Sequence, residues 1–456
     1  MLVSFSVSNF RSFCSEQTFS LVASKRFSGS HETHAVPIPG SNEQVLRTGV
    51  VYGANGAGKS NLFKALRYVE RLIYKPRNKN SGTSRDPFLF GTTKEEPSSF
   101  DVQFIAADKL YRYGLCVEDT RVTKEWLVQI IGSKERYIFE RITEPDGKVT
   151  VNVASNLPDA SEKLKALATV GGLQNQPFLA TVNATLAPED CGSDIRSVIR
   201  WWNELTLIMP SAAYGPLGHK LSKEPEFLTF AGDFLKAAST GVDHLSIEKQ
   251  EISTEDLNAL LPVGARRVLK ELGQDDEPVS VLPLGEGMEL IVERGEGSRY
   301  YRISIQAAHE HHSGSVVKLD LDQESDGTRR LLNLLPALFH LRNSSGVYFI
   351  DEIDRSLHPI LISNFLKSFL QSCEGGYRQI IVTTHESHLL SLDLLRRDEI
   401  WFAEKDNSGA TQLYSLSDFS VRKDLGIRKH YLQGRFGAIP FLGSTDDLAS
   451  DEDAQK

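Results

Sequence analysis

A glycine-rich segment early in the chain carries the residue types needed to bind a polyphosphate. Glycines let the backbone curl so that consecutive N–H groups face phosphate oxygens, while a lysine reaches the β and γ oxygens and a serine hydroxyl ligates Mg²⁺. The apolar run before the segment and the helical spacing after it are the context that such a motif requires. The alternative is a glycine turn that happens to carry Lys-Ser. The segment fits GxxxxGK[ST] and consists of Gly53, Ala54, Asn55, Gly56, Ala57, Gly58, Lys59 and Ser60.

Two adjacent carboxylates follow a second apolar run. Asp351 and Glu352 come directly after Val347–Ile350, a segment typical of a buried parallel strand. Ligands bind at the carboxyl edge of such sheets. There, Asp351 can hold magnesium opposite Ser60, and Glu352 can position or deprotonate an attacking water. The alternative is that the acidic pair only caps the strand and opens a turn.

A histidine is expected at the same sheet edge. Thr383, Thr384 and His385 end another apolar strand, one helical crossover further along the chain than Asp351. Parallel strands joined by such a crossover place their carboxyl ends side by side. An imidazole there can sense the γ-phosphate or orient water. A capping or core histidine is the alternative.

A short polar cluster opens a predicted helix. Glu324, Ser325, Asp326, Gly327 and Thr328 stand directly before helical spacing. By itself this is an ordinary helix cap with a glycine, and its meaning depends on the other motifs.

The elements around these motifs predict an α/β fold. In the last third, helical spacing at 327–341 and 359–372 alternates with apolar strands at 347–350, 379–382 and 399–403. Strands that are apolar on both faces and alternate with helices form a parallel sheet covered by helices. We therefore expect an α/β fold with a mixed or parallel sheet, in which the glycine-rich segment is a P-loop.

The rest of the chain predicts an antiparallel β subdomain and a helical insertion. Short β-rich stretches between 100 and 142 indicate a meander, and segments between about 155 and 275 have helical spacing with little β signal. The predicted division is an N-terminal lobe at 1–155, the insertion at 156–275, a C-terminal lobe at 276–445 and an acidic tail at 446–456 with the composition of a disordered segment.

Composition excludes several classes of protein. The chain has 456 residues, of which 40% are hydrophobic, so it is neither wholly disordered nor a small stapled scaffold. The net charge of −9 argues against a protein that coats nucleic acid, although it does not decide whether a local basic groove exists. We expect no membrane span and no signal peptide. Four cysteines without a CxxC pair fit a reducing cytoplasm.

The order of these motifs resembles the ABC-type ATPase head shared by SMC proteins, RecF and the overcoming-lysogenization-defect group. That resemblance implies ATP and Mg²⁺ as cofactors and a homo-oligomer, in which two heads sandwich two ATP molecules. It also implies roles for single residues. Ser60 and Asp351 would hold magnesium, Lys59, Glu352 and His385 would act in catalysis, Asp354 would be the D-loop residue, and Ser325 and Gly327 would contact the nucleotide of the other head.

Finer features resemble bacterial AAA-family ATPases of anti-phage abortive infection, with AbiL-like ATPases and the PARIS ATPase as relatives. They are FIDEIDRSLHP, HESHLL, DEIWFAEKD and YLQGRFGAIPFLG. This resemblance implies a nucleotide-driven sensor or switch that works with a separate effector, a nuclease. The alternatives are a RecF- or SMC-like DNA-binding ATPase of repair or recombination, and a nucleotide-dependent scaffold with negligible turnover. No residue matches the Q-loop glutamine of the group.

Two further stretches are interpreted as structural. His309-Glu310-His311-His312 is not HExxH and is more typical of a solvated hairpin tip than of a metal site. The basic stretch from Arg422 to Arg435, with Tyr431 and Phe436 interleaved, fits a nucleic-acid surface but fits a solvated or partner-binding surface better.

Overall fold

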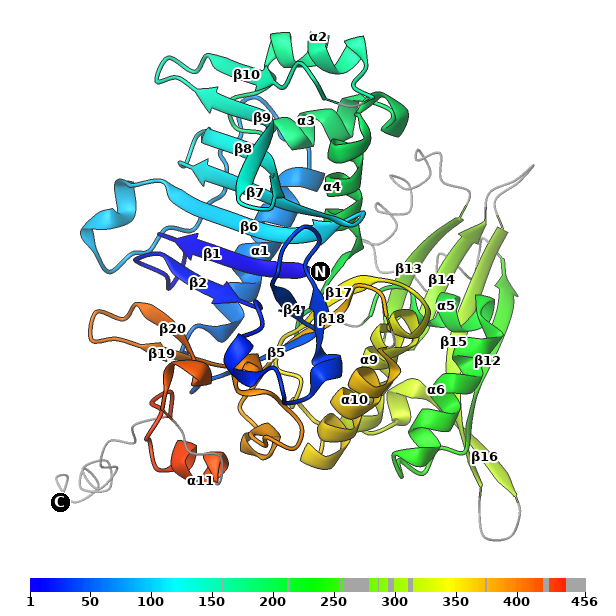
Figure 1. Cartoon of the computed structure of the whole chain (residues 1–456). Helices are drawn as coiled ribbons and strands as arrows, with labels where there is room; N and C mark the ends of the chain where they lie inside the picture. The colour runs from blue at the N-terminus through cyan, green and yellow to red at the C-terminus, as the bar shows by residue number, and fades with distance from the viewer. Residues whose placement is uncertain are drawn as a thin grey trace, which may run out of the picture. The chain divides into compact units, whose positions relative to one another are not determined.

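The computed structural model describes residues 1–157, 159–210, 214–253, 256, 279–285, 287–293, 299–310, 315–373, 375–420 and 426–439. These residues group into two compact units. The first comprises the described residues of 1–207, 346–352 and 374–456, and the second those of 208–345 and 353–373. Both are drawn in Figure 1.

An antiparallel sheet forms one layer of the first unit. Its strand order is β10-β9-β8-β7-β6-β1-β2, which Figure 1 shows from top to bottom. Apolar and polar residues alternate along β1 between buried and partly exposed positions, so one face of the sheet packs on the core. The predicted meander is thus confirmed and extended on both sides. The strands are β1 (Leu2–Ser8), β2 (Gln17–Ser20), β6 (Ser98–Ala106), β7 (Lys109–Val117), β8 (Val122–Ile131), β9 (Lys134–Thr143) and β10 (Val149–Val153).

A second, mainly parallel sheet carries the predicted motifs. Its order is β11-β17-β18-β5-β19-β20. The pairs β17–β18, β18–β5 and β5–β19 are parallel, and β20 adds an antiparallel edge. Every residue of β5 and β17 is buried, as expected for strands covered on both faces. The strands are β5 (Thr48–Tyr52), β11 (Leu205–Ile208), β17 (Gly346–Ile350), β18 (Arg378–Thr384), β19 (Ile400–Lys405) and β20 (Thr411–Ser415); β3 (Ala35–Pro37) and β4 (Gln44–Leu46) form a separate pair.

Helix α1 (Lys59–Tyr74) lies between the two sheets of the first unit. Its apolar positions recur every three to four residues, and all of them except Tyr68 and Tyr74 are buried. Phe63 meets Phe349 of β17 edge to face at 5.0 Å, while the same helix also contacts β1. Trp201 and Trp202 are buried in this core, and Trp201 stacks on Phe104. The other helices of the unit are α2 (Glu162–Val170), α3 (Phe178–Thr185), α4 (Ser193–Glu204) and α11 (Ile427–Leu432).

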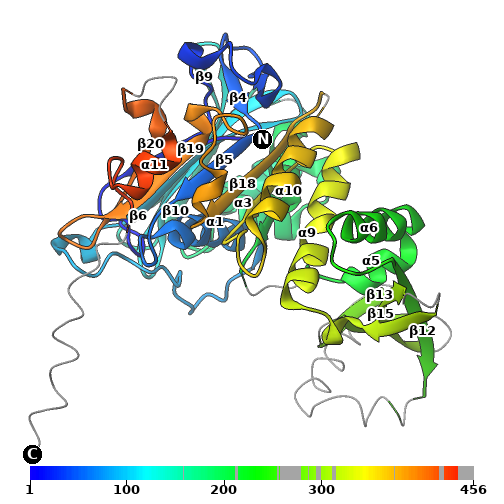
Figure 2. The ribbon, with the colours of Figure 1, turned by 90° about the horizontal axis from the view of Figure 1, so that it is seen from below.

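The second unit contains an antiparallel sheet with helices on one face. The strand order is β12-β15-β14-β13, and β16 pairs with the end of β15. Helix α6 packs on β12 and on α9, α5 packs on β14 and β15, and α9 contacts α10, an arrangement visible in Figure 2. The elements are α5 (Leu217–Lys223), α6 (Pro225–Ala237), β12 (His244–Ile252), β13 (Val279–Gly285), β14 (Met288–Glu293), β15 (Arg299–Glu310), β16 (Val316–Asp320), α9 (Asp326–Asn343) and α10 (Pro359–Ser372).

Short 3-10 helices complete the described parts. They are η1 (Lys25–Phe27), η2 (Glu32–His34), η3 (Thr92–Glu95), η4 (Pro188–Asp190), η5 (Leu321–Gln323), η6 (Ser387–Leu389), η7 (Arg397–Glu399) and η8 (Leu416–Asp418). Among the described residues, no helix is both long and apolar enough to cross a membrane.

The segment expected to be a helical insertion contains two strands. Helix α4 ends at Glu204, where Leu205 turns to an extended conformation and β11 joins the parallel sheet. The sequence prediction treated residues 193–208 as one helical segment and so missed β11. In so short a strand, pairing with a neighbouring strand outweighs the local preference for helix. The expected boundaries at 155 and 275 do not coincide with those of the two units, since α2 to α4 belong to the first unit and α5 and α6 to the second. The helix expected at 254–273, apart from Asp256, and the tail at 446–456 lie outside the described residues.

Candidate nucleotide-binding site

The glycine-rich segment connects β5 to α1, and its glycines are required by the local geometry. Gly56 and Gly58 have φ values of 79° and 104°, in the region that L-residues avoid. A Cβ on Gly56 would meet no atom within 4 Å, whereas one on Gly58 would lie 2.1 Å from Thr411 Oγ1. Gly58 is therefore pressed against the protein, and Gly56 borders open space.

A chain of hydrogen bonds supports this loop from behind. Asn61 Nδ2 donates to Ser12 Oγ at 2.8 Å, and Ser12 Oγ lies 2.8 Å from Thr411 Oγ1. Thr411 Oγ1 also lies 2.8 Å from the Ala57 carbonyl oxygen, which can only accept, so the Thr411 hydroxyl donates to Ala57 and accepts from Ser12. Sequence reasoning missed Ser12 and Thr411, because nothing local links residues so far apart in the chain.

Alanine at Gly58 is expected to destabilise the protein more than alanine at Gly56. Both substitutions place a Cβ at positive φ, which costs about 1–2 kcal/mol. Only Gly58→Ala adds overlap with Thr411, so its total cost is expected to reach about 3 kcal/mol or more. Urea unfolding of the two variants measures the difference. Equal free energies of unfolding would contradict the proposed packing behind the loop.

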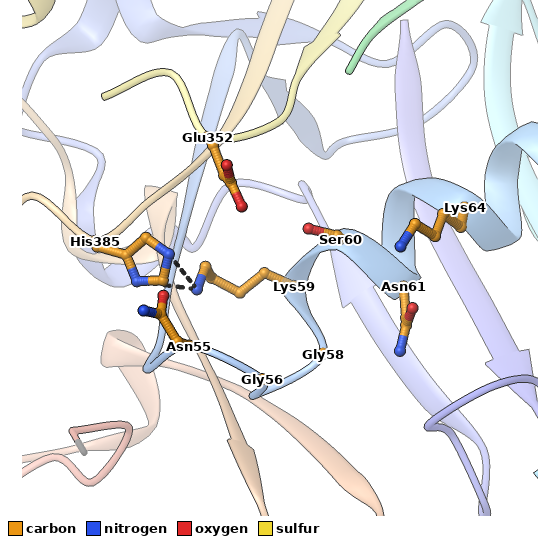
Figure 3. Close-up of a pocket in the computed structure, with 9 residues that line it drawn as sticks. All are labelled: Asn55, Gly56, Gly58, Lys59, Ser60, Asn61, Lys64, Glu352 and His385. Carbon is orange, nitrogen blue, oxygen red and sulfur yellow. Dashed lines mark hydrogen bonds between the residues drawn. The ribbon is translucent and has the colours of Figure 1, made fainter. Parts of the chain in front are cut away.

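The glycine-rich loop, Glu352 and His385 line one cavity of about 230 Å³. Figure 3 shows the Glu352 and His385 side chains directed toward Lys59. Lys64 also lines the cavity, one helical turn after Ser60, and this i, i+4 spacing is the signal by which the sequence could have indicated it. The lining residues are Asn55, Gly56, Gly58, Lys59, Ser60, Asn61, Lys64, Glu352 and His385.

The Lys59 ammonium is buried and held at the loop. Its Nζ donates to the carbonyl oxygens of Gly53 and Ala54 at 2.7 and 3.1 Å. The same atom lies 3.3 Å from each ring nitrogen of His385 (Figure 3). The structure thus brings His385 beside the loop lysine, as its place after a neighbouring strand predicts.

Thr383 connects the acidic pair to the next strand. Its Oγ1 donates to Asp351 Oδ1 at 2.6 Å and accepts the backbone N–H of Glu352 at 2.8 Å. Asp351 and Thr383 are fully buried, while Glu352 is partly exposed and has a φ of 48°. Strained backbone of this kind often occurs at functional sites, where surrounding contacts maintain it. Sequence reasoning noted Thr383 but gave it no role.

A second carboxylate near the cavity is engaged elsewhere. Glu386 follows His385, and its Oε1 accepts a hydrogen bond from the backbone N–H of His388 at 2.8 Å and contacts the His388 ring. Burial alone would raise the pKa of the Glu386 carboxyl, but these hydrogen bonds outweigh it and hold that pKa below its ordinary value. Because Glu386 is bonded to His388 and does not line the cavity, Glu352 is the carboxylate of the two that faces it.

The remaining predicted residues belong to the second unit. Ser325 is the N-cap of α9, an 18-residue helix, and its side chain accepts the backbone N–H of Thr328. A Cβ on Gly327 would lie 2.8 Å from the Ser356 carbonyl oxygen, so close approach of the chain after Asp354 requires glycine there. The roles that the resemblance implies for Ser325, Gly327 and Asp354 stay predictions.

Two interpretations of polar stretches are corrected. Tyr431 and Phe436 are buried, and each stacks on Phe402, so they are core residues rather than surface rings between basic residues. His309 lies near the end of β15, where β15 pairs with β16 in a hairpin, and its ring bonds to Glu324 rather than being fully solvated. Residues 311–314 and 421–425 are outside the described parts. In the parts that are described, no group of three or more His, Cys, Asp or Glu residues could hold a metal ion.

A phosphate-binding loop between a buried parallel strand and a helix, with carboxylates at the same sheet edge, defines a P-loop NTPase. A family model described as "AAA domain, putative AbiEii toxin, Type IV TA system" matches residues 50–149 and 187–391. Because the match covers more than half of the chain, the protein belongs to this family of AAA/ABC-type ATPases. The expectation of an AAA-family ATPase is confirmed at this level, while the closer resemblance to AbiL-like and PARIS ATPases stays a prediction.

Solved structures give weaker similarity. An SMC head domain from Thermotoga maritima is 11% identical with a TM-score of 0.37, over 91% of this chain and 98% of that one. An SMC head bound to the C-winged helix domain of ScpA is 12% identical with a TM-score of 0.38, over 91% and 97%. Such values are too low to assign a function or an assembly. No curated protein matches the chain.

Proposed function

We propose that the protein binds ATP with Mg²⁺ in the cavity of the glycine-rich loop and hydrolyses it. The observation that carries the proposal is the meeting of Lys59, Ser60, Glu352 and His385 around one cavity, although they come from three strand ends. The open space beside Gly56 and the start of α1 at Lys59 fit a polyphosphate lying against backbone N–H groups.

Each residue has a task in this mechanism. Lys59 exchanges its carbonyl partners for phosphate oxygens, and Ser60 and Asp351 are the residues that would hold Mg²⁺, which supplies charge stabilisation at the transferred phosphoryl group. Glu352 orients a water and takes its proton, and His385, beside Lys59, senses the terminal phosphate.

We further propose that two copies of the chain close on ATP. Ser325 is exposed at the start of α9, where a hydroxyl and the helix N-terminus can meet a phosphate of a nucleotide held by another copy. Gly327 would approach the same nucleotide, and Asp354 would act in the D-loop. Support for this assembly comes from the resemblance in motif order, and analytical ultracentrifugation with and without ATP tests it.

We place this switch in anti-phage defence with a separately encoded effector, a nuclease. The family description, which names a putative AbiEii toxin, supports such a context. The second candidate is a DNA-binding ATPase of repair or recombination. Duplex binding by the isolated protein that falls steeply with log salt would favour this second candidate. A net charge of −9 favours the first.

Lys59→Ala is expected to weaken ATP binding by about 100-fold, because a buried charge-assisted contact to phosphate is lost. Arg67→Ala is the matched control, since Arg67 is an exposed cation of the same helix that does not line the cavity. Titration with a fluorescent ATP analogue measures both. If Lys59→Ala stays folded and binds ATP as tightly as the control, the cavity is not the nucleotide site.

A further inference from the structure

Glu324, the residue before the exposed cap Ser325, has a partner on another element. Its side chain is only 5% exposed, and its Oε1 lies 2.6 Å from Nε2 of His309 on β15. A carboxylate can only accept, so the imidazole Nε2 carries the hydrogen. Such a short hydrogen bond to a carboxylate is among the stronger kinds in proteins.

The segment that Glu324 belongs to also has hydrogen bonds within itself and packs on neighbouring residues of the second unit. The turn η5 carries a capping box between Asp320 and Gln323, and the Glu324 N–H donates to the Leu321 carbonyl at 3.2 Å. Ser325 bonds to Thr328, one turn into α9. These internal contacts shape the segment 320–328. Packing then fixes its two ends, because Asp320 pairs with Gln306 of β15 and Gly327 lies close to the Ser356 carbonyl oxygen.

His309 supplies a contact from outside the segment. It faces Val317 across the β15–β16 pair, and the Cβ position of Gly241, just before β12, lies 3.5 Å from its Nδ1. The imidazole therefore lies beside Gly241 while its Nε2 bonds to Glu324. Between the ends of the segment, this side-chain hydrogen bond connects β15 to the residue directly before Ser325.

We propose that His309 is a positioning residue for the start of α9. By bonding to Glu324 it fixes the position of Ser325, and it thereby couples the β15–β16 hairpin to closure of the ATP-bound dimer. The inference rests on the proposed function, in which Ser325 meets the nucleotide of a second copy. It gives a role to His309, the first residue of the HEHH stretch.

The first test uses variants in a Glu352→Gln background, which holds ATP without turning it over. His309→Ala removes the donor, while His309→Gln keeps an N–H at a similar reach. His244→Ala is the matched control, because His244 on β12 pairs with Asp243 in the same sheet but is far from Ser325 in the chain. His309→Ala is expected to weaken ATP-driven dimerisation about tenfold without changing the affinity of the monomer for ATP. His309→Gln should restore dimerisation, and His244→Ala should leave it unchanged.

A mixing experiment separates positioning from stability. Lys59→Ala protomers are expected to bind ATP about 100-fold more weakly. At an ATP concentration near the dissociation constant of the wild-type protein, they therefore mainly offer Ser325 to a wild-type partner. Mixed in excess with wild-type protein, they should support hydrolysis at the remaining site, and Lys59→Ala/His309→Ala protomers should support about tenfold less. A variant that merely loses stability would lower ATP affinity or unfold earlier instead.

The outcomes distinguish the inference from the function on which it rests. If the Glu352→Gln parent does not dimerise with ATP, the proposed closure is wrong and the role of His309 falls with it. If the parent dimerises and His309→Ala dimerises equally well, only the role of His309 is wrong. Loss in His309→Gln as large as in His309→Ala would likewise overturn it, because the donor would then not matter.

Discussion

Replacing Glu352 by glutamine is expected to abolish ATP turnover while ATP still binds. Glutamine has the same shape but cannot accept a proton from water at neutral pH. Removing a positioned general base costs about 100-fold or more in rate. The Lys59 and Ser60 side chains, which we propose contact the phosphates and Mg²⁺ respectively, stay unchanged, so the affinity for ATP should fall little. The variant should therefore accumulate the ATP-bound, closed state.

The measurement pairs a phosphate-release assay with ultracentrifugation. Glu386→Gln is the matched control, since Glu386 is a carboxylate at the same sheet edge whose oxygen is already bonded to His388 and does not line the cavity. The control should hydrolyse ATP at close to the wild-type rate. A wild-type rate in Glu352→Gln would show that another group activates the water.

Much of the site could be predicted because its signals are local. Each of the three motifs stands in the sequence at the end of an apolar strand: the glycine-rich loop, the acidic pair and the segment with His385. Parallel pairing then brings the strand ends to one edge, since the partner strands end in register. Their meeting at a cavity thus follows from three short patterns and one topological rule.

The parts that could not be predicted depend on contacts between distant residues. Thr411 touches Gly58 from the opposite end of the chain, and no periodicity indicates that contact. The resemblance implies a nucleotide contact for Gly327, but no local pattern indicates that the Ser356 carbonyl behind it also requires a glycine there. The residues of β11 were predicted to be helical, because they form a strand only by pairing with β17. In each case the deciding partner comes from tertiary structure.

Thr383 offers the second large effect, because one hydroxyl serves both acidic residues. Thr383→Val keeps the buried shape but leaves Asp351 without this donor and the Glu352 N–H without its acceptor. Contacts that orient metal ligands typically change activity by about 10- to 100-fold when removed, and we expect a loss of kcat in this range. Thr383→Ser keeps the hydroxyl and should retain most of the activity.

Stability must be separated from catalysis in this test. Thr48→Val is the matched control: Thr48 is fully buried on β5 of the same sheet, and its hydroxyl donates to the Ile380 carbonyl at 2.8 Å. Both valine variants should lose about 1–3 kcal/mol of unfolding free energy through an unsatisfied buried group. Only Thr383→Val should lower kcat, because the Thr383 hydroxyl contacts the Asp351 carboxylate and the Glu352 backbone, whereas the Thr48 hydroxyl contacts neither. If the two variants lose activity equally, the effect of Thr383 is stability alone, and the acidic pair does not depend on β18 for its orientation.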